Sequence, residues 1–188
     1  MPRRAANGDE SLNYLLAICL DFGDTLADEA TEIKDETLTT LRADLLPGAA
    51  DLVRALKRRG YRLALVADGR PGTYLNVLSL YGLYDLFDVH TISEPLGVEK
   101  PHPRMFTHTL EQLNISPKDY RRTLMVGNNL ERDVRGANEV GMISVWIDWA
   151  PRRSKIPADD SQTPCYTIKT PLELLDVIDR IEHGANRT

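Results

Sequence analysis

A chain of 188 residues is long enough to bury one sizeable core, and its 42% apolar and 27% charged residues are ordinary for a globular protein. No segment approaches the roughly 20 apolar residues that a membrane span needs. The formal net charge of −5, without a long basic stripe, argues against nucleic acid as a partner. The closest feature, the cluster of Arg152, Arg153 and Lys155, is expected to be a solvated loop.

The first apolar run, residues 15–20, is short and leads straight into Asp21, so it lacks the cleavage site of a signal peptide. We expect residues 1–13 to form a flexible tail and residues 14–188 to form a single domain. Cys19 lies inside this run, and Cys165 is distant from it with no metal-ligand spacing. We therefore expect two reduced thiols and no disulfide, a usage that fits the cytoplasm.

Six short apolar runs predict strands, at residues 15–20, 62–67, 89–92, 123–126, 144–147 and, more weakly, 166–168. The runs are largely continuous and do not alternate with polar residues. Such runs are typical of strands that are covered on both faces, as in a parallel sheet.

Amphipathic helices are predicted between these runs, because apolar residues recur there with a period of about 3.6. In chain order, the buried stripes are Leu52, Val53 and Leu56; Leu75, Leu78 and Val77; Met105, Phe106, Thr109, Leu110 and Leu113; and Val134, Ala137 and Val140. The last helix begins with a capping box at Thr170 and Glu173, and it buries Leu172, Leu175, Ile178 and Ile181. Strands that alternate with helices predict an α/β fold, a doubly wound three-layer sandwich with a mostly parallel central sheet.

Polar residues follow the first, second and fourth runs, at the carboxyl ends where parallel sheets bind ligands. Asp21 follows the first run, Asp68 the second, and Asn128 the fourth, with Asp133 close behind. Hard oxygen ligands gathered in this way suit Mg²⁺, which takes one or two carboxylates and bridges to phosphate. Each residue alone also fits a turn former or a helix cap, so the pattern as a whole indicates the site.

Four segments together resemble the motifs of the haloacid dehalogenase (HAD) superfamily, over nearly the whole chain from residue 15 to residue 181. Residues 20–26 resemble the first motif, usually Asp-x-Asp-Gly-Thr, and residues 63–69 resemble the second, an apolar strand that ends in Ser or Thr. Residues 97–103 resemble the lysine motif, and residues 125–137 resemble the fourth, usually Gly-Asp followed by a second Asp. The resemblance implies the Rossmann-like core of that superfamily and a phosphatase-type hydrolase.

By this resemblance, Asp21 is the nucleophile, whose carboxylate attacks phosphorus and forms an aspartyl-phosphate that water later releases. Lys100 adds a compact positive charge at the same oxygens. Mg²⁺ is held by the side chain of Asp21, the carbonyl of Gly23, and the side chains of Asn128 and Asp133. Backbone N–H groups complete the phosphate site, near Asp24, Thr25, Asp68 and Gly69.

Three positions depart from the superfamily pattern. Gly23 stands where phosphatases have a second aspartate, the usual general acid and base. Its loss predicts a slow enzyme, because such assistance is typically worth ~10²–10⁴ in rate. Whether the neighbouring Asp24 substitutes stays open. Ala67 replaces a hydroxyl donor to phosphate, and Asn128 replaces a metal-binding aspartate, so Mg²⁺ is expected to bind more weakly. The Asp68 side chain is expected to point away from the substrate.

No cap domain fits between these motifs. Residues 27–46 are highly charged and have room for at most a short helix around residues 36–45. We expect an open site that accepts a large phosphorylated partner or takes a wall from a second subunit. The alternative is a catalytically weak or inactive relative that binds a phosphorylated ligand or protein, and dehalogenase or phosphonate chemistry is the smaller remainder. Specificity is expected to reside in residues 27–46, 70–74 and 149–156.

Overall fold

The sheet is the framework of the computed structural model, which describes residues 13–185. All six predicted strands form, and they pair in parallel in the order β5-β4-β1-β6-β7-β8. Their bounds are β1 (Ala17–Leu20), β4 (Arg62–Ala67), β5 (Val89–Ile92), β6 (Thr123–Gly127), β7 (Ile143–Ile147) and β8 (Tyr166–Ile168). The strand order therefore reverses at β1, between β4 and β6. The predicted tail lies almost entirely outside the described residues.

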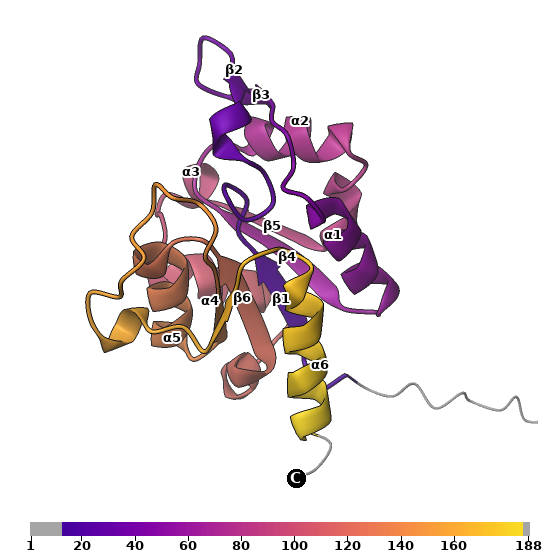
Figure 1. Cartoon of the computed structure of the whole chain (residues 1–188), viewed down its shortest axis with the longest axis vertical. Coiled ribbons are helices and arrows are strands. Elements are labelled where there is room, and N and C mark those ends of the chain that lie inside the picture. Colours follow the sequence, from indigo (N-terminus) through magenta and orange to yellow (C-terminus); the bar gives the residue numbers. More distant parts are fainter. Residues whose placement is uncertain (1–12, 186–188) are drawn as a thin grey trace, which may run out of the picture.

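Helices cover both faces of the sheet, so the molecule has three layers (Figure 1). One face is covered by α1 (Ala49–Arg58), α2 (Pro71–Leu80) and α6 (Glu173–Ala185), and the other by α4 (Pro103–Gln112) and α5 (Arg135–Val140). Successive residues of β1 point to opposite faces: Ile18 and Leu20 join the first core, whereas Ala17 and Cys19 join the second. The predicted α/β fold is confirmed.

Several short elements lie between these strands and helices. They are α3 (Ser93–Leu96), the 3₁₀ turns η2 (Tyr84–Leu86), η3 (Pro117–Arg122) and η5 (Asp160–Gln162), and the π-helical turn η4 (Leu130–Val134).

Two helices match the predicted buried stripes only in part: Val77 and Leu78 in α2 and Ile178 and Ile181 in α6 are buried as expected. In α2, Leu75 is 48% exposed, because the helix also packs on a hairpin and turns Thr73 and Tyr74 inward. In α6, the helix begins only at Glu173, whose carboxylate accepts the Lys169 N–H at 2.9 Å. The buried face of α6 is therefore Leu174, Val177, Ile178 and Ile181.

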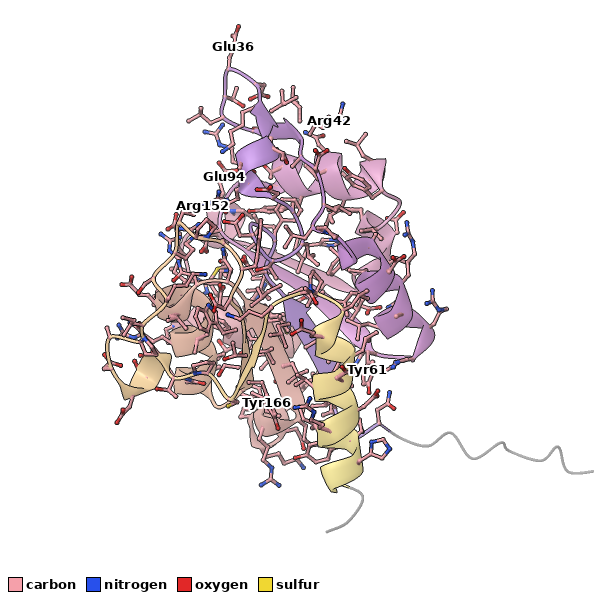
Figure 2. The ribbon with its side chains drawn as sticks, viewed as in Figure 1. Glu36, Arg42, Tyr61, Glu94, Arg152 and Tyr166 are labelled. Atoms are coloured by element: carbon pink, nitrogen blue, oxygen red, sulfur yellow. The ribbon has the colours of Figure 1, made fainter. Side chains whose placement is uncertain are left out.

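The short helix for which residues 36–45 had room does not form in residues 27–46. This segment holds the 3₁₀ turn η1 (Glu29–Thr31) and an antiparallel hairpin of β2 (Ile33–Lys34) and β3 (Thr40–Arg42), with Glu36 at its projecting tip (Figure 2). The hairpin leans on α2, where the Thr40 N–H donates to Thr73 Oγ1 at 3.0 Å and Asn76 Nδ2 donates to the Thr40 carbonyl at 3.1 Å. These contacts favour strand over helix, and the described segment adds a wall but no cap domain.

Both cysteines are free, Cys19 being buried and Cys165 exposed. Burial raises the pKa of the Cys19 thiol to about 12, so it is unreactive. Within residues 13–185, none of the helices combines the length and the apolar character required to cross a bilayer.

Candidate active site

The polar strand ends meet at one edge of the sheet, because β1 lies between β4 and β6. Asp21, Asp68 and Asn128 each follow directly the last residue of one of these strands. They line a pocket of about 380 Å³ together with four more of the predicted site residues, Gly23, Gly69, Lys100 and Asp133. The other two predicted residues, Asp24 and Thr25, are not among its lining residues.

Lys100 joins two carboxylates at the bottom of this pocket. Its Nζ donates hydrogen bonds to Asp21 Oδ1 and Asp133 Oδ1, both at 2.6 Å, and to the Val66 carbonyl at 2.9 Å. The side chains of Lys100 and Asp133 are each only 2% exposed. Burial alone would lower the pKa of Lys100, but the charges of Asp133 and Asp21 outweigh it and raise that pKa. The ammonium group is therefore fixed as a cation between the two carboxylates.

Asp133 reaches Lys100 because Gly127 has no side chain. Asp133 lies in η4, which begins three residues after the last residue of β6, and its Oδ2 accepts the Asn129 N–H at 3.0 Å. A Cβ at Gly127 would lie 2.2 Å from Asp133 Cγ, so only glycine leaves room for this approach. Burial, and then the charge of Asp21, raise the pKa of Asp133. Its ionised form at neutral pH therefore depends on the neighbouring ammonium group.

The turn after β1 orients Asp21 and buries Asp24. Thr25 Oγ1 donates to Asp21 Oδ2 at 3.1 Å, which fixes one face of that carboxylate. The predicted phosphate contacts of Asp24 and Thr25 need correction, because their N–H groups donate to carbonyls inside the turn, at 2.7 and 3.2 Å. Asp24 is fully buried, and its carboxylate accepts the Glu29 N–H at 3.2 Å. Asp24 is thus directed into the turn and away from the pocket lining.

Asp68 and Gly69 line the pocket, but both already make hydrogen bonds to other residues of the protein. Asp68 Oδ1 accepts the Lys100 N–H at 2.9 Å, and its Oδ2 accepts Arg132 Nη1 at 3.1 Å. The Gly69 N–H donates to Ser93 Oγ at 2.9 Å, so this predicted phosphate donor is already used. The positive charge near Asp68 comes from Arg132, which is part of the same pocket lining.

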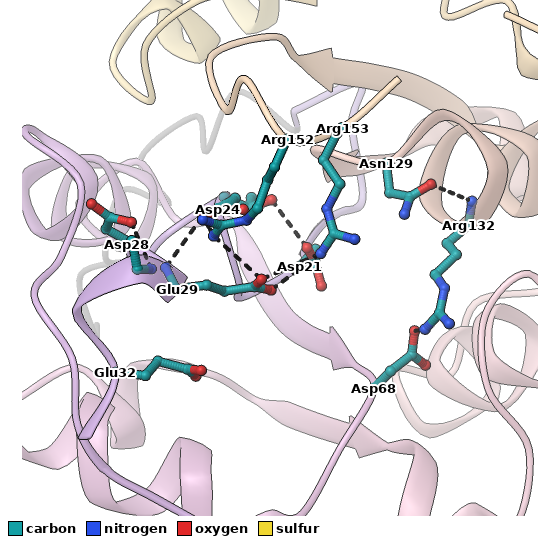
Figure 3. A network of polar contacts seen from close by, with 12 residues as sticks. Asp21, Asp24, Asp28, Glu29, Glu32, Asp68, Asn129, Arg132, Arg152 and Arg153 are labelled. Atoms are coloured by element: carbon teal, nitrogen blue, oxygen red, sulfur yellow. Dashed lines mark hydrogen bonds and ion pairs between the residues drawn. The ribbon is translucent and has the colours of Figure 1, made fainter. Parts of the chain in front are cut away.

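A second ion cluster, absent from the sequence predictions, joins the first turn to the loop after β7 (Figure 3). Arg152 pairs with Asp24 and lies 3.3 Å from Glu29 Oε2, and Arg153 Nη2 lies 3.3 Å from the same oxygen. The expected loop forms and leaves Arg152 and Lys155 exposed, but its basic side chains are ion-paired, since Lys155 also pairs with Asp148. Burial, and then the charge of Asp24, raise the pKa of Glu29, which lines the pocket with Arg153.

The three segments expected to set specificity all contribute to the pocket lining. Residues 27–46 supply one wall, residues 70–74 add Arg70, Thr73 and Tyr74, and residues 149–156 add Arg153. The Tyr74 hydroxyl donates to the Asp68 carbonyl at 2.7 Å, and its ring packs edge-on against Phe22 with centroids 5.1 Å apart. The pocket therefore combines charged side chains with an aromatic wall.

The donor set of the pocket suits a hard divalent cation. Among the described residues, no cluster of three or more His, Cys, Asp or Glu side chains is placed to hold a metal. The pocket instead offers the carboxylates of Asp21 and Asp133 and the side chain of Asn128, whose buried Nδ2 has no hydrogen-bond partner. Two carboxylates and an amide oxygen, completed by water and phosphate, fit Mg²⁺.

The parallel sheet, the Lys100-centred pocket and the four motif segments define a hydrolase of the α/β class. The chain belongs to the haloacid dehalogenase-like hydrolase family, whose model matches residues 5–141.

Curated relatives of the chain are named phosphatases. A glyceraldehyde 3-phosphate phosphatase of Methanopyrus kandleri is 33% identical over 70% of this chain and 55% of its own length. A phosphoserine phosphatase of Thermus thermophilus is 35% identical over 65% of this chain and 47% of its own length. The chain spans about half the length of the curated relatives it matches.

Solved structures agree with this assignment. A HAD phosphatase from Thermococcus onnurineus superposes with a TM-score of 0.62 at 32% identity, over 72% of this chain and 59% of that one. A Bacillus subtilis HAD-hydrolase, described as bound to magnesium, gives a TM-score of 0.72 over 88% of this chain and 99% of that one. At 18% identity, the second likeness shows the fold alone.

Proposed function

We propose that the chain is an Mg²⁺-dependent phosphatase that cleaves phosphate monoesters through an aspartyl-phosphate on Asp21. The observation that carries this proposal is the Lys100 ammonium group, 2.6 Å from both Asp21 and Asp133 in the pocket at the carboxyl edge of the sheet. The named phosphatases among the relatives support the reaction class.

The chemistry follows from these side chains. An Asp21 carboxylate oxygen attacks phosphorus, the ester P–O bond breaks, and the leaving oxygen takes a proton from a general acid or from water. A water molecule then attacks the same phosphorus and gives up a proton to a base, while the bond to Asp21 breaks and returns Asp21 to its carboxylate form. Thr25 orients the nucleophile through its hydrogen bond, and Lys100 balances the negative charge. Mg²⁺, held by Asp21, the Gly23 carbonyl, Asn128 and Asp133, would offset repulsion between the carboxylate and the phosphate.

The substrate is inferred to be a phosphate ester on a large or protruding partner. Within the described residues, the insert between β1 and α1 forms one wall of the pocket and is too small to enclose a substrate. A site that cannot close over a small molecule is best suited to a phosphoryl group carried into it by a protein side chain. A wall from a second copy of the chain would serve the same purpose.

The test is phosphate release from an aryl phosphate, with Mg²⁺ and with a chelator. Turnover is expected only with the metal, and Asp21→Asn is expected to abolish it because the nucleophile is lost. Asp176→Asn, which is exposed on α6, is the matched control and is expected to retain the wild-type rate. Turnover that survives Asp21→Asn would contradict the proposal.

A second candidate is a module that binds a phosphorylated ligand without turning it over. Gly23 and Ala67 favour it, because both lack the polar side chain that superfamily phosphatases use there. Lys100-dependent binding of phosphorylated compounds, with no phosphate released from any of them, would select this candidate over the enzyme.

A further inference from the structure

Glu29 fills the space beside Gly23, where the superfamily's second aspartate would extend. A Cβ at Gly23 would lie 2.0 Å from Glu29 Oε1, 2.8 Å from its Cδ and 2.9 Å from its Cγ. The end of the Glu29 side chain therefore occupies the place at which a side chain of residue 23 would begin. A carboxylate is present at this position although the motif itself has lost one.

Several contacts hold Glu29 in this place (Figure 3). Its backbone N–H donates to Asp24 Oδ1 at 3.2 Å, and its Oε2 lies 3.3 Å from both Arg152 Nη2 and Arg153 Nη2. The η1 turn that carries Glu29 is capped by Asp28. Because Glu29 and Asp21 line the same pocket, a phosphoryl group on Asp21 would share that pocket with the Glu29 carboxylate.

The other pocket carboxylates are committed to different contacts. Asp133 is bound to Lys100, and Asp68 accepts hydrogen bonds on both oxygens. Glu32 accepts Thr40 Oγ1 at 2.9 Å and pairs with the ammonium group of its neighbour Lys34 at 2.8 Å. Apart from the nucleophile, Glu29 is the pocket carboxylate that lies against Gly23.

We propose that Glu29 is the catalytic acid and base of this chain, in place of the aspartate missing at residue 23, an assignment that rests on the proposed phosphatase function. In the first step, the carboxylic acid of Glu29 gives its proton to the leaving oxygen as the ester P–O bond breaks. In the second step, the resulting carboxylate takes a proton from the attacking water as the new P–O bond forms and the bond to Asp21 breaks. The proton balance closes over one cycle.

Glu29→Gln separates proton transfer from positioning. With an alkyl phosphate, whose leaving group is poor, kcat/KM is expected to fall by ~10²–10⁴. With 4-nitrophenyl phosphate the first step needs little acid, so the variant is expected to release nitrophenol in a burst stoichiometric with enzyme and then to stall as the aspartyl-phosphate. Equal losses on both substrates without a burst would mean that Glu29 only holds the turn in place, and would overturn the assignment.

A carboxylate relocated to residue 23 provides the rescue experiment. Glu29→Ala is expected to lose turnover of the alkyl phosphate, and the double variant Gly23→Asp with Glu29→Ala is expected to recover much of it, because the space is then free. Asp176→Asn is the control, since it removes an exposed carboxylate on α6, outside the pocket, and is expected to retain the wild-type rate. Thermal melting of each variant confirms that it is folded.

The outcomes for Glu29 and for the proposed function are distinct. Wild-type turnover that Asp21→Asn abolishes, together with full activity of Glu29→Gln on both substrates, overturns the role of Glu29 and leaves the phosphatase intact. No wild-type turnover on either substrate overturns the phosphatase itself and the role of Glu29 with it.

Discussion

At the scale of single residues, the site depends on one ammonium group that two carboxylates share. Lys100→Met leaves Asp21 and Asp133 facing each other without a cation, and Asp133 is only 2% exposed. Breaking a buried ion pair in this way typically costs about 3–5 kcal/mol. We expect a loss of that order in urea unfolding, and Mg²⁺ is expected to restore part of it by binding the native carboxylates. A variant as stable as the wild type without metal would contradict this account.

Gly127 tests the geometry of the same site without changing its charges. In Gly127→Ala, the new Cβ would lie 2.2 Å from Asp133 Cγ, so Asp133 must move. We expect a folded protein that is less stable by about 1–3 kcal/mol and has lost most of its turnover. The control is Gly184→Ala in α6, where no atom beyond the adjacent residues and the helix's own backbone lies within 4 Å of the added Cβ, and about 0.5–1 kcal/mol of stability is expected to be gained. Full activity in Gly127→Ala would show that the position of Asp133 is not critical.

At the scale of elements, the sheet could be predicted because the residues of each strand are themselves apolar, which indicates burial without reference to the rest of the fold. Ile18 and its neighbours in β1 are apolar on both faces, whatever packs on them. The hairpin in residues 27–46 could not be predicted in this way, because its own apolar residues, such as Leu38, are largely exposed. Its order comes from contacts of Thr40 with Thr73 and Asn76, more than 30 residues away in the chain.

The junction of α1 with the sheet gives a prediction for the pH dependence of stability. Asp88 accepts the Leu63 N–H at 2.8 Å and pairs with Lys57 at 2.6 Å. Burial would raise the pKa of Asp88. The hydrogen bonds from Lys57 and from the Leu63 N–H, together with the charge of Lys57, outweigh burial and lower that pKa. The contribution to stability is therefore present above the pKa of the unfolded chain, about 4, and is lost as the pH falls through the lower folded value. In urea titrations, Asp88→Asn is expected to be less stable than wild type at pH 7, and the difference should shrink at acid pH.

At the scale of the whole molecule, the motif residues could be placed from sequence because the resemblance assigns each of them separately. Asp21, Lys100 and Asp133 come together as expected. The Glu29 cluster could not be predicted, because Glu29 and Arg152 are 123 residues apart and no local pattern marks either one. The one signal was the missing side chain at Gly23, which leaves a space that another carboxylate can fill.

Arg152 links the loop after β7 to the turn after β1, and this contact gives a prediction for stability. It binds Asp24 across 128 residues of chain, and Asp24 is fully buried. Arg152→Ala would leave that carboxylate without its cation, at an expected cost of about 2–3 kcal/mol in urea unfolding.

Asp24→Asn removes the charge that needs a partner, so the double variant is expected to be less destabilised than the sum of the two single variants. A coupling free energy of about 0.5–3 kcal/mol is expected for residues in such contact. Additive losses would show that Arg152 and Asp24 act independently. Coupling would instead mean that the loop after β7 and the turn after β1 are stabilised as one unit, which is the arrangement that presents Glu29 to Gly23.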